Sequence, residues 1–195
     1  MQPDILIALI GFAFITSVTP GPNNMMLMAS GANFGLRRTV PHMLGVSLGF
    51  GAMVMVLGLG FDRLITGTPA LAEALKWISL AYMLWLAWKI ASSSRPSEEK
   101  STARPMTFLQ AAAFQWVNPK AWAMALGALS AYAAGVGGAL VVGLVFALVN
   151  LPSVSLWAAM GQGLRRLLAA PGRLRAFNWT MAAGLVLSML PVLFH

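Results

Sequence analysis

The stretch Thr19-Pro20-Gly21-Pro22-Asn23-Asn24, which we call the first break, interrupts an uncharged segment that covers residues 5–36. This segment is long enough for one membrane pass of about 20 residues. Two prolines remove backbone donors and a glycine loosens the chain between them, so no helix passes through unbroken. In hydrocarbon, such a break persists only where protein or a water-filled cavity satisfies the freed backbone groups. The sequence therefore predicts a membrane helix in two halves, with half of a binding site at the break.

The composition is that of a protein surrounded mostly by lipid. Of the 195 residues, 58% are hydrophobic and 9% are charged, which does not suit a soluble surface. The net charge of +8 is spread over helix ends, so a nucleic-acid partner is not expected. The first residues hold Asp4 and no Lys or Arg, which favours a mature helix over a cleaved signal peptide. These features indicate an integral membrane protein.

We predict an all-α fold with six transmembrane helices, of which the first and fourth are broken. The first is expected over residues 3–16 and again over residues 23–34. The fourth is interrupted at Asn118-Pro119-Lys120, the second break, because Pro119 also disfavours helical geometry at Asn118. Pro41 suits the first turn of the second helix. The remaining helices are expected over residues 41–61, 70–91, 106–132, 139–161 and 177–193.

The basic residues predict the orientation in the membrane. The loops after the first, third and fifth helices, with adjoining helix ends, hold ten of the thirteen Lys and Arg residues, and the loops after the second and fourth hold two. Under the positive-inside rule the first group of loops is cytoplasmic and both termini are external.

The single membrane domain, residues 1–195, divides into two halves. Repeat one covers residues 1–91, a polar cytoplasmic loop covers 92–105, and repeat two covers 106–195. Three helices in each half place the second repeat in the inverted orientation. Paired broken helices at corresponding positions of inverted repeats indicate the binding site of a transporter, because half-helix ends bring dipoles and free backbone groups together near the midplane.

Several motifs also resemble a known family. They are Thr-Pro-Gly-Pro-Asn-Asn at 19–24, Gly31, Gly35, Gly45, Ser47-Leu48-Gly49-Phe50, Tyr82, Trp88-Lys89, Asn118-Pro119-Lys120-Ala121-Trp122 and Phe177-Asn178. With these residues the chain resembles the LysE/RhtB amino-acid exporter superfamily, over nearly its whole length. It is more similar to the RhtB-type branch, which includes exporters of homoserine, threonine and cysteine-related metabolites, than to lysine exporters. The resemblance implies efflux of amino acids across a bacterial cytoplasmic (inner) membrane.

The two breaks offer the groups that a zwitterionic amino acid needs. Free backbone N–H groups at the start of the second half-helix can bind a carboxylate, and carbonyls at the end of the first can accept from an ammonium. Asn23 and Asn24 either bind substrate or cap the half-helix. The expected substrate-binding residues are Pro20, Gly21, Pro22, Asn23, Asn24, Asn118, Pro119, Lys120, Ser47, Asn150 and Ser153, although such serines also bond to neighbouring helices.

Charge placement bears on specificity and coupling. Lys120 is the one charged residue expected deep within a span, where it either links substrate binding to proton movement or extends along its helix toward the interface. Asp62 is the second coupling candidate, with a solvated helix-end charge as its alternative. No acid is expected in mid-membrane to hold a cationic side chain, so neutral substrates are favoured.

The leading hypothesis is a secondary transporter that exports neutral amino acids or close analogues by alternating access. No phosphate-cradling loop is present, so the chain is not expected to hydrolyse ATP. His42 and His195 are too few for a metal site and no cofactor is expected. A non-transporting scaffold or channel-like subunit stays open, as does a membrane-embedded enzyme, although no catalytic cluster supports one. Glycine-rich helix faces permit a homodimer without requiring it.

Overall fold

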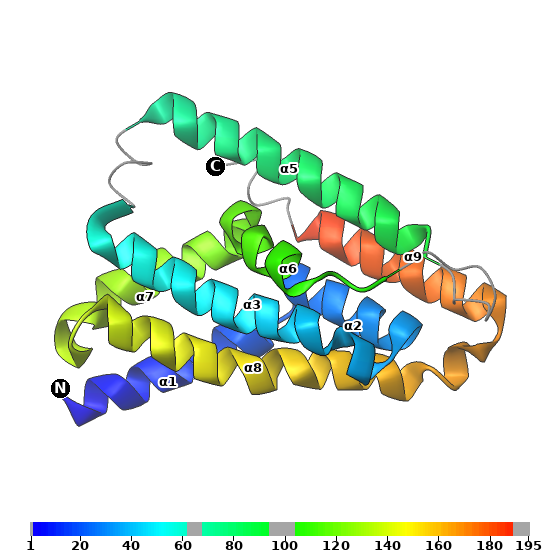
Figure 1. Ribbon diagram of the computed structural model, residues 1–195, viewed down its shortest axis with the longest axis horizontal. Coiled ribbons are helices and arrows are strands. Elements are labelled where there is room, and N and C mark those ends of the chain that lie inside the picture. The colour runs from blue at the N-terminus through cyan, green and yellow to red at the C-terminus, as the bar shows by residue number, and fades with distance from the viewer. Residues whose placement is uncertain (1, 62–67, 94–103, 189–195) are drawn as a thin grey trace.

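The computed structural model describes residues 2–61, 68–93 and 104–188, and within these ranges the regular structure is entirely helical (Figure 1). The longer helices are α1 (Pro3–Val18), α2 (Pro22–Phe34), α3 (Leu36–Val56), α5 (Pro69–Ala91), α7 (Pro119–Val136), α8 (Ala139–Leu164) and α9 (Pro171–Leu187). The shorter elements are a π-helical turn η1 (Leu57–Phe61), helix α6 (Phe108–Phe114), and the 3-10 turns η2 (Gln115–Val117) and η3 (Leu167–Ala169).

The helices are those of a multi-pass membrane protein. Leu36–Gly60, which combines α3 with most of η1, and α8 are each long and apolar enough to cross a membrane. The pair α1 and α2 meets the same test and is bent by 55°, which makes a third span if the pair crosses as one. Six spans therefore remain a prediction, whereas the all-helical fold is confirmed.

Both predicted breaks are present at the expected residues. At the first, α1 ends at Val18 and α2 begins at Pro22. At the second, η2 ends at Val117, Asn118 is extended with φ −94° and ψ 107°, and α7 begins at Pro119. In each case a proline takes the first helical position, where its missing N–H removes no intrahelical hydrogen bond.

Two predicted helix starts are wrong. Helix α3 begins at Leu36 and contains Pro41, because Gly35 adopts a φ of 82° and turns the chain directly into the next helix. The N–H that Pro41 lacks would have bonded the carbonyl of Arg37 in the first, exposed turn, where solvent can replace it. Helix α9 begins at Pro171 rather than at residue 177, so Arg173 and Arg175 lie on a helix. Three ends also shift, with α1 reaching Val18, α7 reaching Val136 and α8 reaching Leu164.

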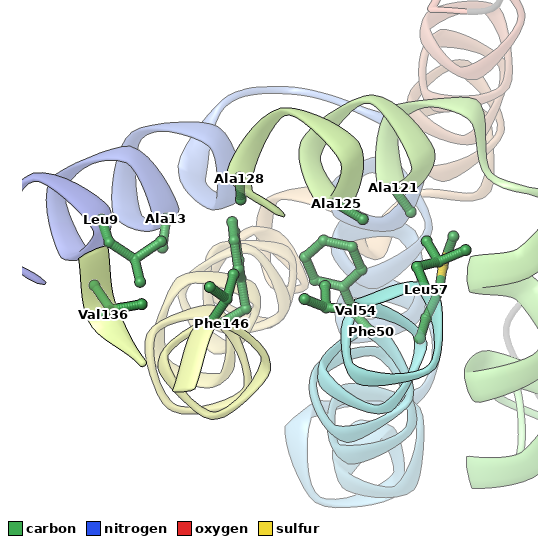
Figure 2. Packing of buried hydrophobic residues seen from close by; sticks show 12 residues of the cluster. Leu9, Ala13, Phe50, Val54, Leu57, Ala121, Ala125, Ala128, Val136 and Phe146 are labelled. Carbon is green, nitrogen blue, oxygen red and sulfur yellow. The ribbon is translucent and has the colours of Figure 1, made fainter. Parts of the chain in front are cut away.

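Helix α8 lies at the centre of the packing, against α1, α2 and α3. In the largest hydrophobic cluster, drawn in Figure 2, the rings of Phe50 from α3 and Phe146 from α8 meet edge to face at a centroid distance of 5.0 Å. Leu9 and Ala13 of α1 join it, and Ala121, Ala125 and Ala128 of α7 cover it. The crossing of α2 and α8 requires glycine on both sides, because a Cβ at Gly31 would meet the Ala158 carbonyl and one at Gly161 would meet the Met28 carbonyl.

The two ends of the bundle differ in charge. Figure 1 shows the amino terminus, the end of α3 and the α7–α8 turn at one end, and the α2–α3 junction, the end of α5 and the α8–α9 connection at the other. Arg37, Arg38, Lys89, Arg165 and Arg166 belong to elements that meet at this second end, which we call the basic end.

Candidate functional site

A pocket lies between the two breaks, which are about a hundred residues apart in the chain. Its volume is about 320 Å³ including the solvent space at its mouth. We call it the break pocket. It is lined by residues of α1, α2, α3, η2, α7 and α8 together with the two breaks, namely Thr16, Ser17, Gly21, Asn23, Asn24, Phe50, Gln115, Asn118, Lys120, Ala121, Met124 and Asn150.

Lys120 joins the second break to the first. Its Nζ donates to the Thr19 carbonyl at 2.8 Å, the Thr19 hydroxyl at 2.9 Å and the Pro20 carbonyl at 3.3 Å, and the residue as a whole is half-buried. No backbone N–H of the described residues bonds these two carbonyls, because α1 stops at Val18. Gly21 makes room for the lysine, since a Cβ there would lie 2.7 Å from Lys120 Cδ. The Lys120 ammonium therefore donates the hydrogen bonds that backbone N–H groups would have donated if α1 had continued.

Amide side chains bind the other groups around the first break. Asn24 Nδ2 donates to the carbonyls of Ser17 at 2.9 Å and Thr19 at 2.7 Å. Asn23 and Gln115 exchange two hydrogen bonds, at 2.8 and 3.2 Å, across the pocket wall. Neither asparagine caps α2, whose N-cap Gly21 has no side-chain cap bond. The capping alternative for these two residues is therefore not what the structure shows.

The polar groups at the second break form hydrogen bonds within their own segment of the chain. Asn118 Oδ1 accepts from the Lys120 backbone N–H at 3.2 Å and so caps α7. Trp122 Nε1 donates to the Trp116 carbonyl at 2.9 Å across the same turn. Asn118 is thus a helix cap that also lines the pocket.

Of the remaining predicted site residues, one lines the pocket, five do not, and one lies outside the described residues. Asn150 is buried and lines the break pocket from α8. Pro20, Pro22 and Pro119 shape the backbone of the breaks without lining the pocket. Ser153 donates to the Val149 carbonyl of its own helix at 3.0 Å, and buried Ser47 has no hydrogen-bond partner among the described residues; neither lines the pocket. Asp62 lies outside the described residues.

Sequence reasoning missed Gln115, Thr19, Thr16, Ser17 and Phe50. Gln115 is fully buried and also donates to the Ala111 carbonyl at 2.9 Å. A polar side chain in an apolar helix, three positions before Asn118, was the signal that could have found it. Thr16 and Ser17 shortly before the first break, with Thr19 at its start, were a second such signal.

The chemistry of the break pocket is that of binding. Its lining, as far as the chain is described, offers one ammonium, several carboxamides and hydroxyls, and no Asp, Glu or His. No group of three or more His, Cys, Asp and Glu side chains gathers as for a metal ion among the described residues. One cationic group beside free carbonyls and amides fits a small, polar, uncharged or zwitterionic ligand.

Comparisons with known proteins agree with this chemistry. The model of the LysE type translocator family matches residues 14–194. The chain is 33% identical over 190 residues to the cysteine/O-acetylserine efflux protein of Klebsiella pneumoniae, covering 95% of each chain. It is 36% identical over 179 residues to the cysteine/O-acetylserine efflux protein of Escherichia coli K12, covering 89% of this chain and 90% of that one.

No solved structure matches this protein significantly. The family match nevertheless covers most of the chain, and both breaks lie within it. The chain belongs to the LysE family of translocators.

Proposed function

We propose that this protein exports small neutral amino acids or close analogues from the bacterial cytoplasm, with the break pocket as its substrate site. The observation that carries the proposal is the Lys120 ammonium seated on the Thr19 and Pro20 carbonyls. An amino acid has an ammonium of its own with three N–H donors, so it can replace lysine at the same acceptors.

Binding then proceeds as an exchange of partners. The substrate ammonium takes the carbonyls of the first break, and the displaced Lys120 ammonium pairs with the substrate carboxylate. The carbonyls of Thr19 and Pro20 keep an ammonium donor at either stage, so the exchange loses no hydrogen bond at the first break. Asn23, Asn24 and Asn150 are placed to orient the remaining polar atoms of the substrate.

The substrate class follows from charge and from relatives. No described residue that lines the break pocket is acidic, so a cationic side chain would find no counter-ion there. The relatives from Klebsiella and Escherichia are named for efflux of cysteine and O-acetylserine. Both molecules are small and carry no net charge near neutral pH, so O-acetylserine and cysteine are the first substrates to test.

The transport cycle is the finer part of the proposal. The six spans form two repeats of opposite orientation, residues 1–91 and 106–195, joined by the loop 92–105. These two repeats rock about the paired breaks and open the pocket to each side of the membrane in turn. The basic end faces the cytoplasm of a bacterial inner-membrane protein, and both termini are external. Lys120 changes partners during the cycle and is the first candidate for coupling to protons, with Asp62 as the second.

Counterflow in proteoliposomes tests the function. Purified protein is reconstituted with an excess of unlabelled amino acid inside, and uptake of radiolabelled O-acetylserine, cysteine, threonine, homoserine and lysine is measured. We expect saturable counterflow of the neutral molecules and none of lysine. Absence of exchange of every neutral amino acid by folded protein would refute the proposal, and exchange without saturation would indicate a channel-like subunit.

Lys120→Met sharpens the same experiment. We expect counterflow to fall by about tenfold or more, since a charge-assisted hydrogen-bonded site is lost. Lys76→Met, in α5 and away from the pocket, is the matched control and should transport as the wild type does. Equal rates for the two variants would remove Lys120 from the substrate site.

A further inference from the structure

A second, larger pocket lies beside α2 toward the basic end. Its volume is about 910 Å³ including the solvent space at its mouth. We call it the basic-end pocket. It is enclosed by one face of α2, His42 of α3, the last turns of α5 and the segment that leads into α6.

One stripe of α2 connects the two pockets. Met26, Ala29, Ser30 and Asn33 line the basic-end pocket and follow the spacing of a single helix face. Asn23, three positions before Met26, lines the break pocket. At 1.5 Å per residue, Asn23 and Asn33 lie about 15 Å apart along the helix. The same helix face therefore leads from the basic end to the break pocket.

His42 is the polar group that this pocket leaves without a partner. The side chain is 1% exposed, and neither ring nitrogen has a hydrogen-bond partner among the described residues. The other buried polar side chains of the lining are paired: Ser30 bonds to Thr39 at 2.9 Å, and Asn33 bonds to Asn178 at 2.9 Å. A buried donor without a partner is unfavourable, so His42 is placed to bind a group that enters the pocket.

The charges around the pocket indicate what that group is. Lys89 and Arg104 line it and are both exposed, and no Asp or Glu occurs among its described lining residues. The Lys89 ammonium lies 5.0 Å from the centre of the Trp85 ring. A neutral imidazole donates one N–H, and two cations that line the same pocket favour an anion. Apolar side chains, including Met26, Leu86 and Met106, complete the wall and suit the rest of a small organic molecule.

We propose that the basic-end pocket is a second substrate site, which binds the carboxylate of the outgoing amino acid through His42, Lys89 and Arg104 before the molecule reaches the break pocket. This inference rests on the proposed export function. It adds a site on the cytoplasmic side, so that one chain binds two substrate molecules at saturation.

Equilibrium binding tests the number of sites. Radiolabelled O-acetyl-L-serine is titrated onto purified protein in detergent, and the number of bound molecules per chain is measured by scintillation proximity. We expect two bound molecules per chain for the wild type and one for the Lys120→Met variant. In the Lys120→Met background, the double change Lys89→Gln with Arg104→Gln should weaken the remaining binding by about three- to tenfold, as expected for loss of partly solvated charged contacts.

Transport separates this second site from the first. In counterflow, the double change Lys89→Gln with Arg104→Gln should raise the half-saturating concentration of O-acetylserine at the basic end by about three- to tenfold. The maximal rate of counterflow should stay unchanged. Arg173→Gln with Arg175→Gln removes the same charge from exposed positions outside the pocket and is the control. His42→Leu should also raise this half-saturating concentration. If His42→Leu does not fold, the double variant at Lys89 and Arg104, which changes exposed residues, still decides the test.

The outcomes distinguish the two proposals. Suppose that the wild type shows counterflow but binds one molecule per chain, and that the Lys89 and Arg104 double variant keeps the wild-type half-saturating concentration. These results would overturn the second site and leave the export function standing. No binding and no exchange of any amino acid by the wild type would overturn both.

Discussion

The two breaks look alike in sequence but are stabilised in different ways. Each ends one helix and opens the next with a proline at the first helical position. At the second break the polar groups are satisfied locally, by the Asn118 cap and by Trp122 bonding to Trp116. At the first, Lys120 and Asn24 reach back to the free carbonyls, and Gln115 bonds Asn23 from 92 residues away.

This difference assigns separate roles to the breaks. A local cap is covalently close to its partner and has little reason to leave it. A distant ammonium on free carbonyls can be exchanged for another ammonium, which is what a substrate site requires. In the proposed function, the second break therefore acts as an anchor that presents Lys120, and the first supplies the acceptors that lysine and substrate would share.

The largest expected effect comes from separating α2 from α8, because this packing holds the first break in place. Gly161→Ala would push a Cβ into the Met28 carbonyl and Ala32 nitrogen of α2. We expect the free energy of unfolding to fall by about 3 kcal/mol, as for overpacking at a backbone contact. Denaturation followed by tryptophan fluorescence measures it. Gly163→Ala in the same helix meets nothing within 4 Å and is the control.

The second prediction compares the asparagines of the two breaks directly. Asn24→Ala leaves two carbonyls at the end of α1 without this donor and should lower the free energy of unfolding by about 2 kcal/mol. Asn118→Ala removes a single cap bond and should lower it by about 1 kcal/mol. The same denaturation measurement applies to both. An equal or reversed order would contradict the distinction between a long-range and a local break.

The third prediction concerns Gly21, whose missing side chain makes room for Lys120. Gly21→Ala places a Cβ 2.7 Å from Lys120 Cδ, so the flexible lysine shifts while the backbone stays in place. Because Gly21 is extended at φ −178°, alanine brings no backbone strain. We expect the rate of counterflow to fall severalfold, which corresponds to an increase of about 1 kcal/mol in the activation free energy. The free energy of unfolding should stay nearly unchanged. Gly127→Ala should have no effect on counterflow, because among the described residues the new Cβ would meet only Phe12, at 3.9 Å.

The smallest expected effect concerns the pair that ties the breaks together. In a double-mutant cycle, Asn23→Ala and Gln115→Ala should show a coupling free energy of about 1 kcal/mol in unfolding, because they exchange two neutral hydrogen bonds. Asn23→Ala combined with Asn118→Ala is the comparison, and we expect these two changes to add. Absence of coupling in the first pair would mean that Gln115 does not stabilise the first break.

Predictions that depended on local backbone chemistry were the successful ones. Pro22 and Pro119 each take the first position of a new helix, so both breaks could be located to within about two residues. Pro41 shows the limit of the same reasoning. Its place as the sixth residue of α3 depends on Gly35 turning the chain early and on an exposed first turn, neither of which a proline signals.

Side-chain roles were harder to predict because they depend on partners far along the chain. The sequence predicts that Asn23 and Asn24 either cap α2 or bind substrate. The structure pairs them with Gln115 and with the end of α1 rather than with the start of α2, and substrate binding stays a prediction. Ser47 and Ser153 share the polarity of Asn150, yet only Asn150 lines the break pocket. Which of several polar residues on a helix faces the pocket depends on helix rotation, and composition does not determine that.

The sequence by itself determined that the chain is helical and membrane-embedded, and where its helices break, since these properties follow from apolar runs and from the covalent geometry of proline. Only the tertiary structure decided that the Lys120 ammonium bonds the carbonyls of the first break and that His42 lines a second pocket with no hydrogen-bond partner in the described part of the chain. These arrangements depend on how α2 and α7 pack against their neighbours, and contacts between distant segments are selected by the whole core.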